Sequence, residues 1–338
     1  MTILVTGGMG FIGSHTIAAL AEAGYESIIL DNLFNASPNV LPRLEQITGK
    51  TIPFYHGDVR DRILLQKIFN LHNIEAVIHF AGLKAVGESV QKPLEYYNNN
   101  VYGSMVLLEE MQRAGVFNII FSSTATVYGI PETIPLTENM PTGMTTNPYS
   151  QSKYVVERIL HDTVISDSRW SAIILRYFNP VGAHESGLIG ESPNGIPNNL
   201  LPYICQVALG KIKQLNIFGN DYPTHDGTGI RDYIHVVDLA EGHLKAMQAK
   251  HNQPGLHIYN LGTGKGLSVL DIIHAFEQAS QIKIPYIFGP RRAGDITEYY
   301  ADTTKAATEL NWQAKRSLQD IMHDTWHWQQ KNPNGYDK

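Results

Sequence analysis

The start of the chain joins a short apolar run to a glycine-rich loop. The run is Ile3 to Val5, and the loop reads Thr6-Gly7-Gly8-Met9-Gly10-Phe11-Ile12-Gly13, with glycines spaced as both G-x-x-G-x-x-G and G-x-G-x-x-G. Glycines at these positions let the chain turn sharply, let backbone N–H groups approach a pyrophosphate, and let the next helix pack tightly on the strand. The loop therefore predicts a strand–loop–helix unit that binds a dinucleotide.

Further apolar runs alternate with amphipathic stretches over the first half of the chain. The runs at Ser27 to Leu30, Ala76 to Phe80, Asn118 to Phe121 and Ala172 to Leu175 are typical of buried strands. This alternation predicts an α/β fold, a Rossmann-type doubly wound parallel sheet with helices on both faces. In such sheets the ligand crevice lies beyond the carboxyl ends of the strands, so we expect the functional side chains there.

The length of 338 residues is enough for two domains with a cleft between them. Gly- and Pro-rich loops after Asn179 indicate the boundary. We expect a dinucleotide-binding Rossmann domain over residues 1–179 and a smaller mixed α/β substrate domain over residues 180–338. The segment from Ile230 to Val237 is strand-like and precedes a helical pattern, so the first domain is also expected to recruit residues from about 230–260.

Charge and composition narrow the class of partner. The net charge is −6 and the isoelectric point is near 6.1, so no global positive field favours nucleic acid as a partner. No apolar run approaches the roughly 20 residues of a membrane span, and the first basic residue is Arg43, so we expect no membrane association and no signal peptide. The single cysteine, Cys205, suits a reducing compartment, and we expect a cytoplasmic protein without a metal site.

Two aspartates refine the cofactor prediction. Asp31 ends the second predicted strand at the distance expected of a carboxylate that accepts hydrogen bonds from an adenosine ribose. It would repel a 2′-phosphate, and no Arg or Lys occurs from Met1 to Pro42, so NAD is favoured over NADP. Asp58 follows a further predicted strand, which lies between those ending at Leu30 and beginning at Ala76. It could accept from the adenine amino group, although a plain turn aspartate is the competing interpretation.

Tyr149 and Lys153 are candidate catalytic residues because a spacing of four places them on one face of a helix. A free tyrosine has a pKa near 10, so a tyrosine base needs a stabilised phenolate. Lys153 and the positive ring of the oxidised cofactor would both lower the pKa of Tyr149. The strand ending at Phe121 continues into Ser122-Ser123-Thr124. Thr124 could share the substrate proton, while some of these hydroxyls could simply satisfy backbone groups.

Three longer segments carry a resemblance to a known family. They read His79-Phe80-Ala81-Gly82-Leu83-Lys84-Ala85-Val86-Gly87-Glu88-Ser89, Arg176-Tyr177-Phe178-Asn179-Pro180-Val181-Gly182-Ala183-His184 and Arg231-Asp232-Tyr233-Ile234-His235-Val236. With the glycine loop, Asp31 and the Tyr149/Lys153 pair, the chain resembles from end to end the extended short-chain dehydrogenase/reductase family. The resemblance implies an isomerase of galactose metabolism that interconverts UDP-glucose and UDP-galactose. In the implied reaction, the hydride on carbon 4 of the sugar would pass to NAD. The resulting 4-keto sugar would then turn over, and the hydride would return to its opposite face.

The resemblance also implies further site residues, in addition to those of the glycine loop. Thr124 joins Tyr149 and Lys153 as the third catalytic residue. The residues expected to bind NAD are Gly7, Gly10, Phe11, Ile12, Gly13, Asp31, Asn32, Leu33, Phe34, Asn35, Ala36, Asp58, Val59, Phe80, Ala81, Gly82, Leu83, Lys84, Asn99, Ser122, Tyr149, Lys153, Tyr177 and Phe178. Those expected to bind the UDP-hexose are Lys84, Thr124, Tyr149, Asn179, Asn199, Leu200, Asn216, Ile217, Phe218, Arg231, Tyr233, Arg292, Asp295 and Tyr299. The two arginines suit a diphosphate because guanidinium groups are planar and always charged.

The sequence departs from the family pattern at two positions. Thr124 stands where the family often has Ser and keeps the hydroxyl, whereas Ala36 replaces a frequent polar residue and removes a possible cofactor hydrogen bond. Tyr299 is bulky and borders the implied sugar pocket, so we expect N-acetylated hexoses to be largely excluded. The resemblance further implies a homodimer that pairs the helices around Tyr96 to Arg113 and Tyr149 to Leu160.

Two other functions share parts of this pattern. A nucleotide-sugar 4,6-dehydratase also has the glycine loop and the Tyr/Lys pair, but such members carry Asp-Glu after the strand-end Thr, where this chain has Ala125-Thr126. A non-catalytic NAD-binding regulator typically lacks the Tyr/Lys pair that this chain retains. Conversion of UDP-galactose to UDP-glucose distinguishes all three.

Overall fold

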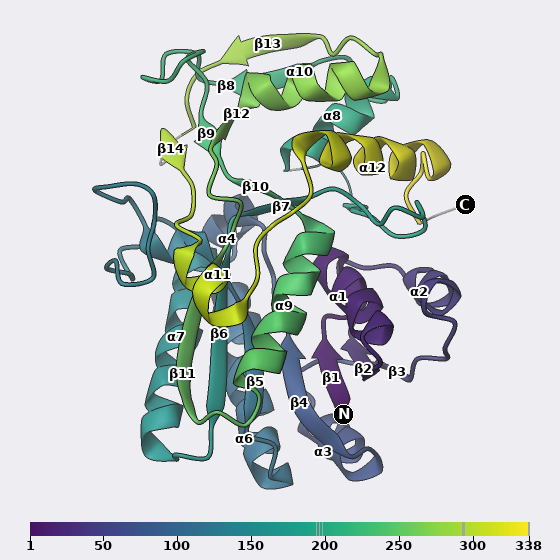
Figure 1. The fold of residues 1–338 in the computed structure, drawn as a ribbon, viewed down its shortest axis with the longest axis vertical. Coiled ribbons are helices and arrows are strands. Elements are labelled where there is room, and N and C mark those ends of the chain that lie inside the picture. Colours follow the sequence, from purple (N-terminus) through teal and green to yellow (C-terminus); the bar gives the residue numbers. More distant parts are fainter. Residues whose placement is uncertain (194, 196, 198, 293–294, 337–338) are drawn as a thin grey trace.

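Seven parallel strands form the main sheet of the computed structural model, which describes residues 1–193, 195, 197, 199–292 and 295–336 (Figure 1). The five strands predicted from Ile3 to Leu175 all lie in this sheet, so the expected Rossmann-type α/β fold is confirmed. In spatial order the strands are β11 (Gly255–Leu261), β6 (Ser171–Tyr177), β5 (Asn118–Thr124), β4 (Ile74–His79), β1 (Thr2–Thr6), β2 (Glu26–Asp31) and β3 (Phe54–His56).

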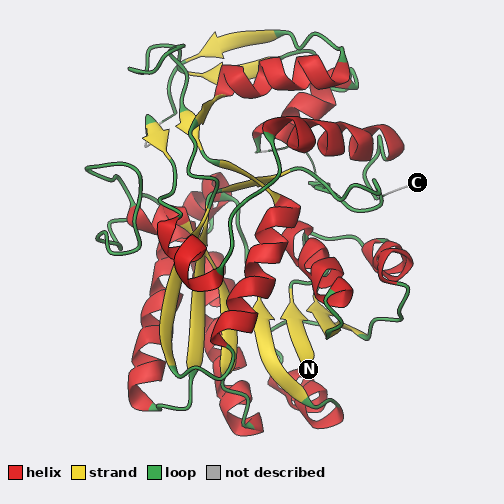
Figure 2. Ribbon diagram, viewed as in Figure 1, coloured by secondary structure: helices red, strands yellow, loops and turns green. Residues whose placement is uncertain are grey.

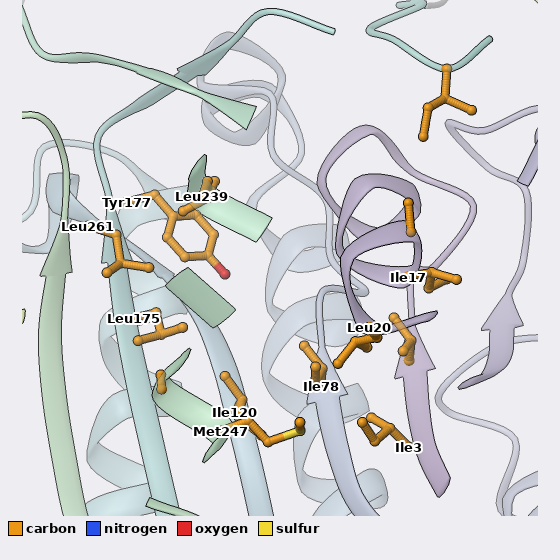
Figure 3. Close-up of a cluster of buried hydrophobic side chains, with 14 of the residues drawn as sticks. Ile3, Ile17, Leu20, Ile78, Ile120, Leu175, Tyr177, Leu239, Met247 and Leu261 are labelled. Atoms are coloured by element: carbon orange, nitrogen blue, oxygen red, sulfur yellow. The ribbon is translucent and has the colours of Figure 1, made fainter. Parts of the chain in front are cut away.

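The central strands of this sheet bury both of their faces. Ile3 and Val5 belong to the core on one face, and Leu4 belongs to the core on the other, because successive side chains point to opposite sides. Helices cover both faces (Figure 2). One core is completed by α1 (Phe11–Glu22), α2 (Val40–Thr48) and α9 (Val236–Lys250), and the other by α3 (Arg62–Leu71), α6 (Gly103–Ala114) and α7 (Pro148–Ser166). Figure 3 shows the first core.

A second, smaller unit lies beyond the carboxyl ends of the main strands (Figure 1). Its core joins Ile204, Phe276 and Met322 from three helices. Its elements are α8 (Leu200–Ala208), β8 (Leu215–Phe218), α10 (Val269–Ser280), β13 (Tyr286–Gly289) and α12 (Leu318–Lys331). Two small sheets run between the units: β7 (Asn179–Val181) with β10 (Tyr233–His235), and β9 (Ile230–Arg231) with β12 (Leu267–Ser268) and β14 (Glu298–Tyr299).

The remaining helices are short and lie beside the main sheet. They are α4 (Val86–Gln91), α5 (Pro93–Tyr96), the π-helix η1 (Tyr97–Tyr102), the 3₁₀-helix η2 (Ala125–Tyr128) and α11 (Thr304–Leu310). In the part of the chain that the structure describes, no helix combines the length and the apolar character that crossing a bilayer requires.

The strand predicted from Ile230 to Val237 is wrong as a single element. It divides at Asp232 into β9 and β10, which pair in different small sheets, and α9 already begins at Val236. The Asp232 carboxylate is fully buried and accepts hydrogen bonds from the N–H groups of Thr263, Gly264 and Ala301. Its side chain therefore fixes the point at which the chain changes sheets. The later strand β11 extends the main sheet beside β6.

We expect Asp232→Asn to lower the free energy of unfolding by about 2–4 kcal/mol, because an amide replaces a charged acceptor and leaves buried donors unpaired. Urea unfolding at fixed protein concentration measures this. The matched control is Asp221→Asn, whose carboxylate is 70% exposed and pairs with Arg291; it should leave the free energy of unfolding nearly unchanged, because exposed ion pairs add little stability. Equal effects of the two substitutions would contradict the role given to Asp232.

Candidate active site

The glycine loop after β1 is packed so closely against neighbouring backbone that a side chain would not fit at Gly7 or Gly13. Gly7 has φ +71°, and a Cβ there would lie 2.7 Å from the backbone nitrogen of Ala81. A Cβ on Gly13 would lie 2.4 Å from the carbonyl oxygen of Gly7. Gly10 is the N-cap of α1 and has no side chain to cap the first turn, so the N–H groups of that turn are free to bind an anion. The loop therefore fits a dinucleotide pyrophosphate.

Asp31 ends β2 beside this loop, as predicted. Its Oδ2 accepts from Met9 N at 3.0 Å, and its Oδ1 accepts from Leu33 N at 2.8 Å. These bonds tie the glycine loop to the segment 32–36, which includes the predicted Phe34, exposed at 57%. Burial raises the pKa of Asp31, and the two backbone N–H groups oppose that rise. The carboxylate is thus held at the edge of the loop where a ribose would lie.

Asp58 follows β3, and its carboxylate accepts from Arg60 N at 2.9 Å, as a turn aspartate does, as well as from side chains. Arg60 donates to both of its oxygens at 2.7 Å, and Asn32 donates at 2.9 Å. The Arg60 hydrogen bonds hold the pKa of Asp58 near 2. Arg60 was missed by sequence reasoning, although its position two residues after an aspartate in a turn was a usable signal. Its guanidinium also donates to Asn98, so it is occupied by two side-chain partners.

Helix α7 carries the predicted Tyr149/Lys153 pair. Pro148 starts the helix, and the Asn147 side chain caps it by accepting from Ser150 N at 2.9 Å. Lys153 is buried, and its Nζ donates to the carbonyl oxygen of Ser122 at 2.7 Å. Burial lowers the pKa of Lys153 to about 8. The helix is therefore anchored to the carboxyl end of β5, where the row of hydroxyls begins.

The expected lowering of the Tyr149 pKa by Lys153 is wrong for the chain alone. Burial raises the pKa of Tyr149 to about 12, and the neighbouring Thr124 side chain opposes that rise. Lys153 is directed to the Ser122 carbonyl instead. The Thr124 oxygen accepts from Thr126 N at 3.2 Å and is hydrogen-bonded to the Thr126 hydroxyl at 3.1 Å, where either oxygen can be the donor. A phenol, a hydroxyl and an ammonium thus meet at the end of β5.

Asn100 adjoins the predicted cofactor residue Asn99 and was itself missed by sequence reasoning. Its buried side chain accepts from Leu83 N at 2.8 Å, donates to Leu83 O at 3.0 Å and donates to Ser152 Oγ at 2.9 Å. It therefore joins the loop after β4 to α7. The Asn98-Asn99-Asn100 run was the available signal, and it lies in the π-helix η1, a deformation frequent at functional sites.

The predicted residues of β6 and β14 lie on either side of this region. Tyr177 ends β6, and its hydroxyl is hydrogen-bonded to His243 of α9. The rings of Phe178 and Tyr299 lie 5.7 Å apart, and the Tyr299 hydroxyl donates to the Ala125 carbonyl. Both rings are buried in a small cluster with Ala125 and Tyr128. The Tyr299 side chain is therefore held in place beside Ala125, the residue that follows Thr124.

The two predicted arginines share one carboxylate. Arg231 forms an ion pair with Asp295, and Arg292 Nε lies 3.5 Å from the same carboxylate. Arg292 also lies over the ring of Phe218, 4.8 Å from its centre. Two positive groups and one negative group leave a local excess of positive charge in an acidic protein. This arrangement suits a diphosphate, which arginine binds through paired donors.

The other predicted substrate residues do not form one cluster. Lys84 and Asn199 meet through Glu191, which sequence reasoning missed: Lys84 Nζ lies 3.4 Å from its carboxylate, and Asn199 donates to it at 2.7 Å. The Asn216 side-chain oxygen on β8 is buried without a hydrogen-bond partner in the described structure. It is an acceptor that a ligand donor would satisfy. Leu200, Ile217 and Tyr233 pack in or against the core of the smaller unit.

The other predicted cofactor residues follow the strands of the main sheet. Phe80, Ala81 and Gly82 come directly after β4, and Val59 is buried after β3. A separate cavity of about 430 Å³ lies at the amino ends of β1 and β2, between residues such as Thr2, Ser27 and Ile52. It is lined by none of the predicted site residues.

Comparison with known proteins agrees with this geometry. Residues 3–262 match the NAD dependent epimerase/dehydratase family. The chain is 64% identical to the UDP-glucose 4-epimerases of Neisseria meningitidis serogroup B and of Haemophilus influenzae, over 99% of each chain. It is also similar to the crystal structure of UDP-glucose 4-epimerase from Bifidobacterium longum in complex with NAD⁺ and UDP, with a TM-score of 0.96 and 55% identity over 99% of this chain and 100% of that one. The chain therefore belongs to the NAD dependent epimerase/dehydratase family.

Proposed function

We propose that this chain is an isomerase that interconverts UDP-glucose and UDP-galactose with bound NAD. The observation that carries the proposal is the meeting of Tyr149, Thr124 and Lys153 at the carboxyl end of β5, beside a glycine loop that fits a pyrophosphate. Full-length relatives at 64% identity bear the name of this activity. The residues Ala125-Thr126 after the strand-end Thr124 disfavour the dehydratase alternative.

In this reaction the side chains of the protein transfer one proton, and the hydride is transferred by the cofactor. Tyr149 takes the proton of the sugar 4-hydroxyl and returns it, and Thr124 donates to the phenolate oxygen in between. NAD, when bound, supplies the hydride acceptor and donor for carbon 4 of the sugar. Lys153 donates to the Ser122 carbonyl and so holds α7, which carries Tyr149, at the end of β5. Because burial raises the pKa of Tyr149, the phenol stays protonated until a further positive charge comes close.

The substrate is held at one end and left free at the other. Arg231 and Arg292 bind the diphosphate, and Asn216 to Phe218 with Leu200 surround the uridine. The hexose lies between Thr124 and Tyr299, where the 4-keto sugar turns over without leaving. Strong contacts to UDP and few contacts to the hexose are required, because both faces of the sugar must reach the same reacting groups.

NAD binding and UDP-sugar binding belong to different units of the fold. Residues 1–179 with about 230–260 form the NAD-binding domain, and residues 180–338 form the UDP-sugar domain. The protein acts in the cytoplasm as a homodimer. Support for the dimer comes from the apolar side chains Leu94, Tyr102 and Met105, which are exposed at 82%, 45% and 41% on neighbouring helices.

Replacing Tyr149 with Phe should lower kcat for conversion of UDP-galactose to UDP-glucose by about 10²- to 10⁴-fold, the usual contribution of a positioned acid–base group. Binding of UDP, measured by calorimetry, should stay within about twofold because Tyr149 does not contact the nucleotide. Tyr154→Phe on the same helix is the matched control. Unchanged turnover in Tyr149→Phe would exclude the proposed proton transfer.

The Tyr299 side chain should decide the size of the sugar that is accepted. Tyr299→Ala removes a buried ring and its hydrogen bond to Ala125, so we expect turnover of UDP-N-acetylglucosamine relative to UDP-glucose to rise about tenfold or more. The adjacent Tyr300→Ala serves as control. Comparable turnover of both substrates by the unmodified chain would contradict the proposed exclusion.

The proposed dimer predicts a pair of chains in solution. Met105→Glu should shift the mass measured by light scattering from two chains toward one, because it buries a charge in the apolar contact. Ile287→Glu, which changes a residue on β13 that is exposed at 50% against 41% for Met105, should leave the mass unaltered. A monomeric unmodified protein at micromolar concentration would refute the dimer.

A further inference from the structure

Glu191 bridges the two units of the fold through one carboxylate oxygen. Its Oε1 accepts from the Asn199 amide at 2.7 Å and lies 3.4 Å from the Lys84 ammonium. Lys84 follows β4 in the main unit, and Asn199 is the N-cap of α8 in the smaller unit. The Glu191 side chain is 11% exposed, whereas that of Lys84 is 51% exposed. A nearly buried carboxylate thus meets two residues that are each expected to bind the UDP-hexose.

The backbone around Glu191 is held by the last part of the described chain. The Tyr336 hydroxyl accepts from Gly190 N and donates to Gly190 O, both at 3.0 Å. A Cβ on Gly190 would lie 2.5 Å from the indole ring of Trp328, so a larger residue would not fit. The Trp328 Nε1 donates to the Glu191 carbonyl at 3.2 Å. The Glu191 carboxylate therefore extends toward its partners from a fixed backbone.

The orientation of the Asn199 side chain is set by Glu191. Asn199 begins α8, but its side chain makes no hydrogen bond to the first turn of that helix. Asparagine at an N-cap ordinarily accepts from the N–H groups of the first turn. Here its amide nitrogen donates to Glu191 instead. The Asn199 side chain is thus tied to the segment before α8 and to Lys84, and not to its own helix.

The Lys84 end of the bridge is joined to the helix that carries Tyr149. Leu83 N donates to Asn100 Oδ1 at 2.8 Å, and Asn100 Nδ2 donates to Ser152 Oγ at 2.9 Å. The Ser152 hydroxyl in turn donates to the Tyr149 carbonyl at 2.7 Å. These bonds fix the backbone just before Lys84 to the start of α7. Through Glu191, the start of α7 is therefore connected to the start of α8.

We propose that Glu191 is a positioning residue that ties the smaller unit to the main unit beside the hexose, so that the 4-keto sugar turns over without leaving. The inference rests on the proposed reaction and on the expected roles of Lys84 and Asn199. An ion pair with a half-exposed lysine contributes little to stability, so the bridge opens readily to admit substrate and release product. While the bridge is closed, it holds two of the expected hexose contacts together.

A zero-length cross-link tests the bridge without relying on activity. In the holoenzyme a carbodiimide should join Lys84 Nζ to the Glu191 carboxyl carbon as an amide, and the carbodiimide takes up the lost water as a urea. Mass spectrometry of the digested protein should find this pair in the unmodified chain, and Glu191→Gln should abolish it. The Lys283–Glu277 pair, with nitrogen and oxygen 2.7 Å apart, is the positive control. Recovery of the control pair alone would overturn the proposal.

Turnover tests what the bridge does. Glu191→Ala should raise KM for UDP-galactose about tenfold, with a smaller change in kcat. If the 4-keto sugar leaves after its hydride has passed to NAD, the hydride stays on the cofactor, so bound NADH should accumulate during turnover. The absorbance of the reduced nicotinamide measures this. Glu191→Gln, whose amide oxygen can accept from both partners, should restore KM to within about threefold. Glu185→Ala, which removes an exposed carboxylate on the same loop, is the matched control.

A combined variant separates positioning from packing. In a background of Lys84→Ala with Asn199→Ala, Glu191→Ala should change KM less than about twofold, because Glu191 acts through these two residues. The full effect of Glu191→Ala in that background, or no accumulation of reduced cofactor in Glu191→Ala alone, would overturn the proposal. Thermal unfolding identifies any variant that fails to fold, and the cross-link in the unmodified chain does not depend on them. If the unmodified holoenzyme did not convert UDP-galactose, the proposed function would fail, whatever the cross-link showed.

Discussion

Parallel pairing of strands that are buried on both faces is the constraint on which the site depends. β5 pairs with β4 and β6, and Thr124 lies opposite Tyr177 in that register. Because both faces of the sheet are filled by the two cores, polar side chains can reach a ligand only where the strands end. Asp31, Thr124 and Tyr177 therefore converge at one edge, although they are far apart in sequence.

Helix α7 is held to this edge by buried polar contacts in addition to apolar packing. Lys153 donates to the Ser122 carbonyl at 2.7 Å, and the buried pair between Glu157 and Arg176 joins α7 to β6 at 2.7 Å. Glu157 also accepts from Ser123. A buried ion pair of this kind adds little stability compared with an apolar pair, but it allows few alternative positions for the helix. The position of Tyr149 relative to Thr124 follows from that restriction.

The electrostatics of the site favour a protonated Tyr149 in the chain alone. Burial raises its pKa to about 12, and Lys153 is directed to a backbone carbonyl. In the reaction proposed above, the positive charge that makes Tyr149 a base therefore comes from the cationic ring of the bound cofactor.

The five strands, the glycine loop, the NAD preference from Asp31 and the Tyr149/Lys153 pair could all be predicted from the amino-acid sequence, because they depend on short spacings and on the period of buried residues. Which polar groups meet could not be predicted and follows from the packing of the folded chain. Tyr177 and His243 are 66 residues apart, and Asp232 divides a predicted strand because its carboxylate accepts from residues about 30 and 70 positions later. No local pattern encodes such pairs, because each exists only once distant strand ends and helices are packed together.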